Sequence, residues 1–310
     1  MKSRPKQLSF FKYFRGHWQL YLMLLPPLTL LIIFCYGPMY GIIIAFKDYT
    51  VSKGILHSPW AADHGFYHFL KFFRNYNFKE VLINTLTLSI YSILVNTPCA
   101  ILLALALNYT RNIRLKKTIQ LITYCPYFIS TIVFVSILKM ILDTRMGVIG
   151  KTVYEVFGTN LMANPEAFPS LYVWSGVWQT VGFNAIIYIA ALSGVDLQLH
   201  EAAIIDGATL LQRIWHVDLP SIAPTVIIML ILNMGSILNV GYEKVLAMQN
   251  QNNISASEVI STYSYKVSLV ASFPDFSYAT AIGLFQSVVG LILLLTVNKI
   301  ADVLTGNGFV

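Results

Sequence analysis

Two groups of residues in this sequence have the types that bind metal ions or nucleotides. The first consists of His57, His64 and His68 with Asp63, within a polar stretch of residues 47–80. A spacing of four would place His64 and His68 on one face of a helix, but no Glu lies between them as in the zinc-protease pattern. We therefore expect solvated loop histidines here and no metal site.

The second group is Gly150-Lys151-Thr152, which looks like the end of a phosphate-binding loop. That pattern requires another glycine five residues earlier, and Arg145 occupies this position. We therefore predict that the chain binds no cofactor, has no catalytic residues and does not hydrolyse ATP. Transport driven by ATP would need a separate ATPase.

Residues 196–220 form a polar segment between two long apolar runs, where they are well placed to contact a partner in the aqueous phase. Asp196 is a good N-cap, and residues 197–206 favour a helix. The run Glu201-Ala202-Ala203 offers one acid beside two minimal side chains, so a partner backbone can approach closely. Gly207 can adopt a left-handed conformation and end the helix.

A second short helix is expected after this glycine. Ala208, Leu211 and Trp215 recur at spacings of three and four, which favours an amphipathic helix. Leu219-Pro220 then turns the chain into the next apolar run, because proline suits the first turn of a helix. These residues alone are equally consistent with a docking segment and with an ordinary loop between spans.

The elements that must position this segment are membrane spans. Only 11% of the 310 residues are charged, whereas soluble domains carry about 25%. Six runs of at least 21 residues lack Asp, Glu, Lys and Arg, and about 20 residues cross the hydrocarbon core as a helix. The runs are 16–46, 81–110, 118–138, 167–195, 219–242 and 276–298. They predict six spans, at about 18–46, 81–107, 119–142, 171–193, 220–243 and 277–299.

The net charge of +7 is placed around these spans rather than on a surface suited to nucleic acid. Two dense basic clusters precede the first run and separate the second from the third. Short loops rich in Lys and Arg stay in the cytoplasm, so both termini are expected there. The clusters are Lys2, Arg4, Lys6, Lys12 and Arg15, and Arg111, Arg114, Lys116 and Lys117.

The spacing within residues 201–220 resembles the cytoplasmic coupling motif of binding-protein-dependent ABC importers. Three residues separate Glu201-Ala202-Ala203 from Gly207, and nine more precede Val217-Asp218-Leu219-Pro220, with Val217 where the family usually has Ile. In that family the motif docks the permease onto its ATPase. The resemblance thus implies a coupling role for Glu201, Ala202, Ala203, Asp206, Gly207, Leu219 and Pro220.

Shorter similarities along most of the chain resemble the oligosaccharide and polysaccharide permeases among these importers. They lie at residues 36–41, 45–49, 84–86, 238–243 and 276–280. Together with the coupling motif, they imply an all-α integral membrane protein with the type I ABC importer permease fold, six transmembrane helices and a cytoplasmic coupling helix.

This resemblance also implies a function and partners. The chain would be a multi-pass permease subunit of an ATP-driven sugar importer in a bacterial cytoplasmic membrane, forming half of the translocation pathway. Its expected partners are membrane lipid, a related but different second permease subunit, two ATPase subunits that bind ATP and Mg, an extracytoplasmic substrate-binding protein and an oligosaccharide.

Candidates for contact with the sugar are polar side chains in or near the fourth and fifth spans. Sugars need hydrogen-bonding groups and aromatic faces, and buried polar groups in a membrane need partners. Hydrogen bonding between helices is an equally good explanation of each candidate. The candidates are Asn184, Tyr188, Asn233, Asn239 and Tyr242.

We divide the chain into three regions. Residues 1–80 hold a cytoplasmic lead, the first span and an outer loop; residues 81–300 hold the transmembrane core with the coupling motif at 196–220; residues 301–310 form a short tail. A secondary transporter and a non-transporting membrane scaffold remain alternatives. A secondary transporter would need ion-coupling charges within the membrane, and the six runs contain none.

Overall fold

The computed structural model describes residues 18–305, and side chains through residue 303. This part of the chain has one isolated β-bridge, between Lys47 and Trp60, and is otherwise built of helices and turns, which confirms the expected all-α class. The expected basic lead and the end of the tail lie outside the described residues. The α-helices are α2 (Trp18–Leu31), α3 (Gly37–Met39), α4 (Gly54–His57), α5 (Tyr67–Arg74), α6 (Phe78–Tyr109), α7 (Ile113–Tyr124), α8 (Thr131–Ile141), α9 (Val148–Phe157), α10 (Phe168–Ser193), α11 (Leu197–Ile205), α12 (Leu210–Arg213), α13 (Leu219–Gly235), α14 (Tyr242–Met248), α15 (Ile254–Ser257), α16 (Ile260–Tyr265) and α17 (Phe276–Thr305).

Short 3-10 and π-helical turns connect several of these helices. The π-helical turns are Ile32–Tyr36, Ile214–Asp218 and Lys266–Val270. The 3-10 turns are Tyr40–Phe46, Asp63–Gly65 and Cys125–Phe128.

Five helical segments within residues 18–305 are long and apolar enough to cross a membrane. They are Trp18–Phe46, Phe78–Tyr109, Phe168–Ser193, Leu210–Gly235 and Phe276–Val303. A sixth crossing exists only if a bent pair of helices, Ile113–Phe128 and Thr131–Ile141, is taken as one broken span. The prediction of a continuous third span at 119–142 is therefore wrong, because the chain turns by 105° inside it.

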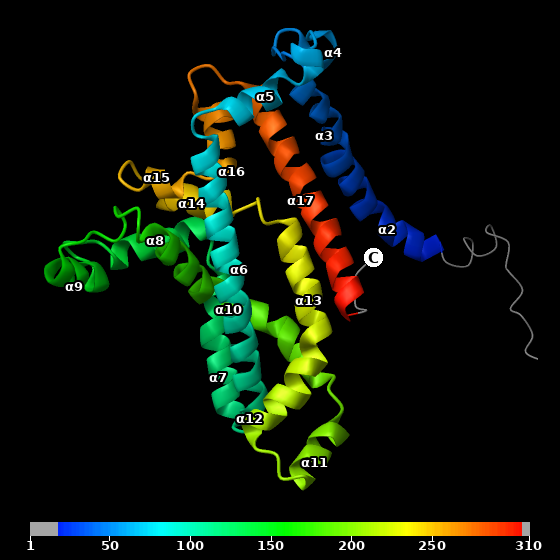
Figure 1. Ribbon diagram of the computed structural model, residues 1–310, viewed down its shortest axis with the longest axis vertical. Helices are drawn as coiled ribbons and strands as arrows, with labels where there is room; N and C mark the ends of the chain where they lie inside the picture. Colours follow the sequence, from blue (N-terminus) through cyan, green and yellow to red (C-terminus); the bar gives the residue numbers. More distant parts are fainter. Residues whose placement is uncertain (1–17, 306–310) are drawn as a thin grey trace, which may run out of the picture.

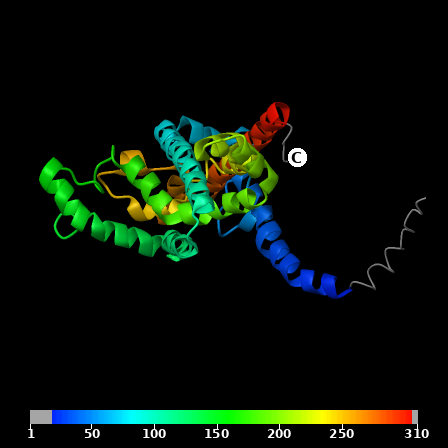
Figure 2. The ribbon, with the colours of Figure 1, turned by 90° about the horizontal axis from the view of Figure 1, so that it is seen from below.

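The turn in this region begins at a proline. Pro126 lies in the 3-10 turn that ends α7, and the two residues after the turn, Ile129 and Ser130, have extended backbone. Proline has no N–H to donate and clashes with the preceding helical turn, which favours a kink or a break in the helix at this point. As a result, α8 and α9 project sideways from the bundle, away from α2 (Figure 2).

Apart from α2, which projects away from the other helices, the remaining helices form an elongated bundle in which α6 and α10 pack along one another (Figure 1). At the lower end of this view lie α11 and α12, and α4 and α5 lie at the opposite end. The predicted fifth span at 220–243 is longer at its start and shorter at its end, because α12 continues through a π-helical turn into α13, which stops at Gly235.

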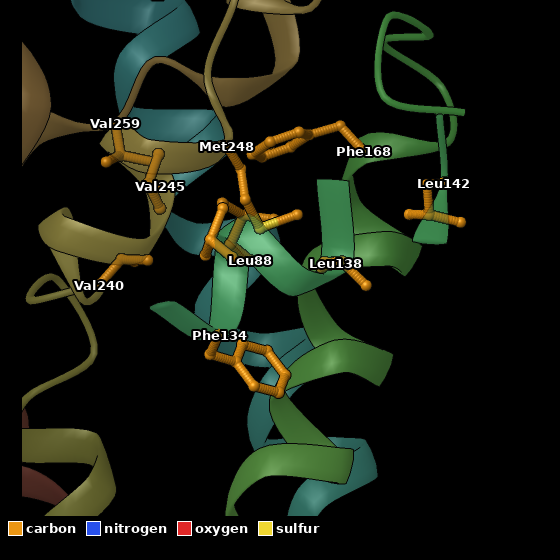
Figure 3. Close-up of a cluster of buried hydrophobic side chains, with 10 residues drawn as sticks. Leu88, Phe134, Leu138, Leu142, Phe168, Val240, Val245, Met248 and Val259 are labelled. Atoms are coloured by element: carbon orange, nitrogen blue, oxygen red, sulfur yellow. The ribbon is translucent and has the colours of Figure 1, made fainter. Parts of the chain in front are cut away.

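The core that holds α6, α10 and α13 together is apolar and contains residues far apart in sequence. Side chains from α6, α8, α10 and the α14 region interdigitate around Phe134 and Met248, which are fully buried (Figure 3). A second cluster joins α6 and α10 to the start of α13 around Ala104, Ala185 and Ile222. The first cluster anchors α8 against the bundle.

The histidines of the loop after the first span have different environments. His57 and His64 are exposed, as expected for loop residues. His68 instead lies on α5 and is buried, with its Nε2 3.1 Å from Asp48 Oδ1. The expectation that it is a solvated loop residue is therefore wrong, because the packing of α5 removes one face of that helix from solvent.

Candidate functional site

The segment expected to bind a partner begins with α11. The Asp196 side chain accepts a hydrogen bond from Gln198 N at 2.9 Å, which confirms the predicted N-cap. The helix ends at Ile205, and Gly207 has a φ of 80°, in the left-handed region that glycine adopts without strain. The expected helix and its glycine turn are both present.

The surface of α11 is open along its whole length. None of its residues is buried, and four large apolar side chains are exposed: Leu197, Leu199, Ile204 and Ile205. Exposed apolar groups gathered on one short helix are typical of a surface that another protein covers. Glu201 and Ala202 are exposed on the same helix, and Ala203 is half-buried.

The second part of the segment faces α11 across a hollow of about 310 Å³. In α12, Thr209 and Gln212 form a reciprocal capping box, with Gln212 Oε1 accepting from Thr209 N at 2.7 Å. This cap holds the start of α12 directly after the glycine turn. Of the motif residues, Ala203, Asp206 and Gly207 line the hollow, whereas Leu219 and Pro220 open α13.

A buried carboxylate ties this segment to the transmembrane bundle. Asp218 has no exposed surface, and its Oδ2 accepts a hydrogen bond from Tyr109 OH, at the end of α6, at 2.6 Å. His200 Nε2 of α11 lies 3.3 Å from Asp218 Oδ1, an ion-pair distance when the histidine is protonated. The Arg213 guanidinium lies 5.8 Å from the centre of the Tyr109 ring. Sequence reasoning included Asp218 in the coupling motif but predicted no buried contact for it, although an acid beside an apolar run was a visible signal.

We expect Asp218→Ala to lower the thermal stability of the purified protein. The Tyr109 hydroxyl would lose its buried acceptor, at a cost of about 1–3 kcal/mol. Thermal unfolding in detergent should show a lower midpoint for Asp218→Ala than for the parent. Asp206→Ala, which removes an exposed acid from the same segment, should leave the midpoint unchanged. Equal midpoints for the two variants would show that the hydrogen bond between Tyr109 and Asp218 does not stabilise the protein.

A second candidate site is a polar hollow between α6, α10 and α13, with a volume of about 140 Å³. Three of the five predicted pathway residues, Asn184, Tyr188 and Asn233, line it. The structure adds side chains that sequence reasoning missed, because α6 supplies Ser92, Asn96 and Thr97. These residues lie in an otherwise apolar run. Asn96 and Thr97 follow Ser92 by four and five residues, and this spacing could have indicated a polar face on the helix.

Hydrogen bonds connect the two walls of this hollow. Asn96 Nδ2 donates to Thr180 Oγ1 at 3.1 Å, and Asn184 Nδ2 lies 3.4 Å from both Asn96 Oδ1 and Thr180 Oγ1. The longer contacts are weak, so the Asn184 amide retains hydrogen-bonding capacity. The interhelical role considered for this residue and a role toward a ligand are therefore compatible.

The other two predicted pathway residues lie beyond the end of α13. Asn239, together with Asn233, lines a neighbouring hollow of about 160 Å³ that also includes Tyr172. The Tyr242 side chain is exposed, its ring lies 5.9 Å from that of Tyr265, and it lines neither hollow. Tyr242 is thus separated from the other four candidates.

Residues 96–307 match the family described as "Binding-protein-dependent transport system inner membrane component". This match covers most of the bundle and the whole segment from α11 to Pro220. The chain belongs to this family. It is therefore a transport permease of the cytoplasmic membrane, and its several apolar spans are those of a multi-pass protein.

Individual relatives cover nearly the whole permease. It is 40% identical to Protein LplB of Bacillus subtilis (strain 168), over 93% of this chain and 89% of that protein. It is 39% identical to the polygalacturonan/rhamnogalacturonan transport system permease protein YteP of the same organism, over 91% of this chain and 87% of that protein.

Solved structures give the same result for the fold. A bacterial ABC transporter involved in the import of the acidic polysaccharide alginate contains a chain 35% identical to this permease, with a TM-score of 0.84 over 95% of this chain and 99% of that one. A second structure, of the alginate transporter with an alginate pentasaccharide-bound periplasmic protein, gives a TM-score of 0.85 at 34% identity, over 96% and 99% of the two chains. The ABC importer permease fold expected from sequence is thereby confirmed.

Proposed function

We propose that this permease carries an oligosaccharide across the cytoplasmic membrane as one half of an ATP-driven importer. The main support is the polar hollow between α6, α10 and α13, whose amide and hydroxyl groups suit a sugar. YteP is named for polygalacturonan and rhamnogalacturonan transport, and the alginate transporter is named for an acidic polysaccharide, so polysaccharide fragments are the cargo class we adopt.

We assign the surface of α11 and α12 to the contact with an ATPase. This segment combines exposed apolar side chains with Glu201, an acid that forms no hydrogen bond or ion pair within the described residues. Closure of two ATPase subunits on ATP and Mg would move α11, and the tie through Asp218 would carry that movement to α6 and α13. Rocking of the two permease halves then gives alternating access to a site between them.

The proposal includes the remaining subunits and an orientation. A second, related permease completes the pathway, and a substrate-binding protein delivers the oligosaccharide on the outer side. We take the α11 end of the bundle as cytoplasmic, because the short connection between α6 and α7 is rich in basic residues. With the bent pair counted as one crossing, both termini would lie on that same side. ATP hydrolysis belongs to the partner ATPases, because Arg145 replaces an essential glycine of the phosphate-binding loop.

Transport by the complete complex in proteoliposomes tests this function. We expect oligosaccharide uptake that requires ATP and the binding protein. Asn184→Leu should lower the uptake about tenfold, because an amide in the hollow is replaced by an apolar group that cannot bond to a sugar hydroxyl. Asn252→Leu, the same exchange at an exposed position outside the hollow, is the control.

The alternatives predict other results from the same assay. A secondary transporter would move sugar without ATP when an ion gradient is present. A membrane scaffold would show no uptake under either condition. Equal uptake by Asn184→Leu and the parent would remove the hollow from the pathway while leaving the transport function in place.

A further inference from the structure

Lys244 is a buried cation beside the proposed pathway. It lies on α14, and only 7% of its surface is exposed. Its Nζ donates one hydrogen bond, to Tyr172 O of α10, at 2.9 Å. Two aromatic rings flank the ammonium group: the Nζ lies 4.8 Å from the ring centre of Tyr172 and 5.6 Å from that of Phe134.

No acid of the described chain forms an ion pair with this lysine. By contrast, Lys71 and Lys266 pair with carboxylates at 2.7 and 2.8 Å. Buried Lys47 donates to two backbone carbonyls at the end of α4. An ammonium group has three protons to donate, and a buried charge without a counter-charge is costly. Lys244 donates one hydrogen bond within the described chain, so its ammonium group can donate to a further acceptor.

The helix face next to Lys244 connects the two polar hollows. Tyr172, Gly176, Thr180 and Asn184 follow one another at intervals of four along α10, so they lie on one face. Tyr172 lines one hollow, and Asn184 lines the other. A Cβ added at Gly176 would lie 3.2 Å from Lys244 Nζ, so the glycine leaves room for the ammonium group beside Tyr172. Lys244 itself lines neither hollow, and Tyr172 links it to the hollow that also includes Asn239.

We propose that Lys244 is a counter-charge site for the carboxylate of an anionic, uronic-acid oligosaccharide passing between these hollows. This inference rests on the proposed transport function and adds the charge of the substrate to it. A carboxylate beside an ammonium group forms a charge-assisted hydrogen bond, and Tyr172 at the same position lines one of the hollows. A neutral oligosaccharide would make no use of a buried, unpaired cation.

The test compares two probes in the complete reconstituted complex: tri-galacturonate and its fully methyl-esterified, neutral form. Lys244→Gln retains a hydrogen-bond donor for Tyr172 O and removes the charge. We expect it to lower tri-galacturonate uptake about tenfold and to change uptake of the ester less than twofold. Lys244→Arg keeps the charge and should retain tri-galacturonate uptake. The binding protein is the same throughout, so differences between parent and variants arise in the permease.

A pH profile with tri-galacturonate alone gives a second readout. Burial lowers the pKa of Lys244 to about 7. Because lysine is charged below its pKa, uptake by the parent relative to Lys244→Arg should fall as the pH rises through 7. Carboxylates of the probe stay ionised over this range. Few other titratable groups lie on the helices around Lys244. Of the helices packed against α14, α8 has one charged residue, Lys139, and α16 has tyrosines but no acid. The one acid on α14 itself is Glu243.

Three results would overturn the inference. They are unchanged tri-galacturonate uptake in Lys244→Gln, equal losses for both probes, and a parent that carries only the ester. A parent complex that takes up no oligosaccharide with ATP would instead show that the proposed transport function is wrong, and the inference would fail with it.

Discussion

Replacing Gly207 with valine is expected to lower ATP-dependent uptake about tenfold or more while the protein remains in the membrane. The φ of 80° at this position is a genuine outlier for a β-branched residue, although nothing in the described chain lies within 4 Å of the added Cβ. The expected strain is about 1–3 kcal/mol, and 1.4 kcal/mol corresponds to a factor of ten. The backbone would relax by reorienting α11 relative to α12, which displaces the proposed ATPase contact.

Two control variants separate backbone strain from the added side chain. Gly207→Asn introduces a side chain that tolerates the left-handed conformation, so uptake should be largely retained. Gly283→Val, in α17, makes the same exchange where φ is not positive and no atom lies within 4 Å. The measurements are oligosaccharide uptake and co-purification of the ATPase at matched membrane levels. Full uptake by Gly207→Val would show that α11 is only a loop between spans.

Replacing Gly182 with alanine is expected to weaken the packing of α7 on α10. A Cβ added at Gly182 would lie 2.2 Å from Thr123 O and 2.5 Å from Thr123 C. Both atoms belong to the backbone of α7, so no side chain can move aside and the two helices must separate. Overpacking of this kind typically costs about 1–3 kcal/mol, and a rigid backbone neighbour places this site at the upper end.

Thermal unfolding in detergent measures this effect. The midpoint temperature of Gly182→Ala should lie well below that of the parent, and its yield from membranes should fall. Gly283→Ala is the matched control, because the space around Gly283 is open. Equal midpoints for the two variants would mean that α7 and α10 do not form a close contact in the native protein.

Much of the fold followed from local properties of the sequence. Charge-free runs long enough to cross the bilayer predicted six spans, and five of them are present as single helical segments, because apolar length is a property of a contiguous segment. The cap at Asp196 and the left-handed turn at Gly207 were also predicted correctly, since both depend on residues within one or two helical turns. The coupling motif is likewise contiguous, and the resemblance that it carries led to the right family.

Only the tertiary structure decided which distant residues meet. The run at 118–138 is as apolar as a straight span, yet the chain bends after Pro126, and α8 then packs against α14. Asp218 and Tyr109 form a hydrogen bond although more than a hundred residues separate them in sequence. Lys244 likewise donates to the backbone of α10 across more than seventy residues. Composition and periodicity report the neighbours of a residue along the chain. The counter-charges, hollows and buried hydrogen bonds instead depend on how the helices cross, and this follows from packing over the whole bundle.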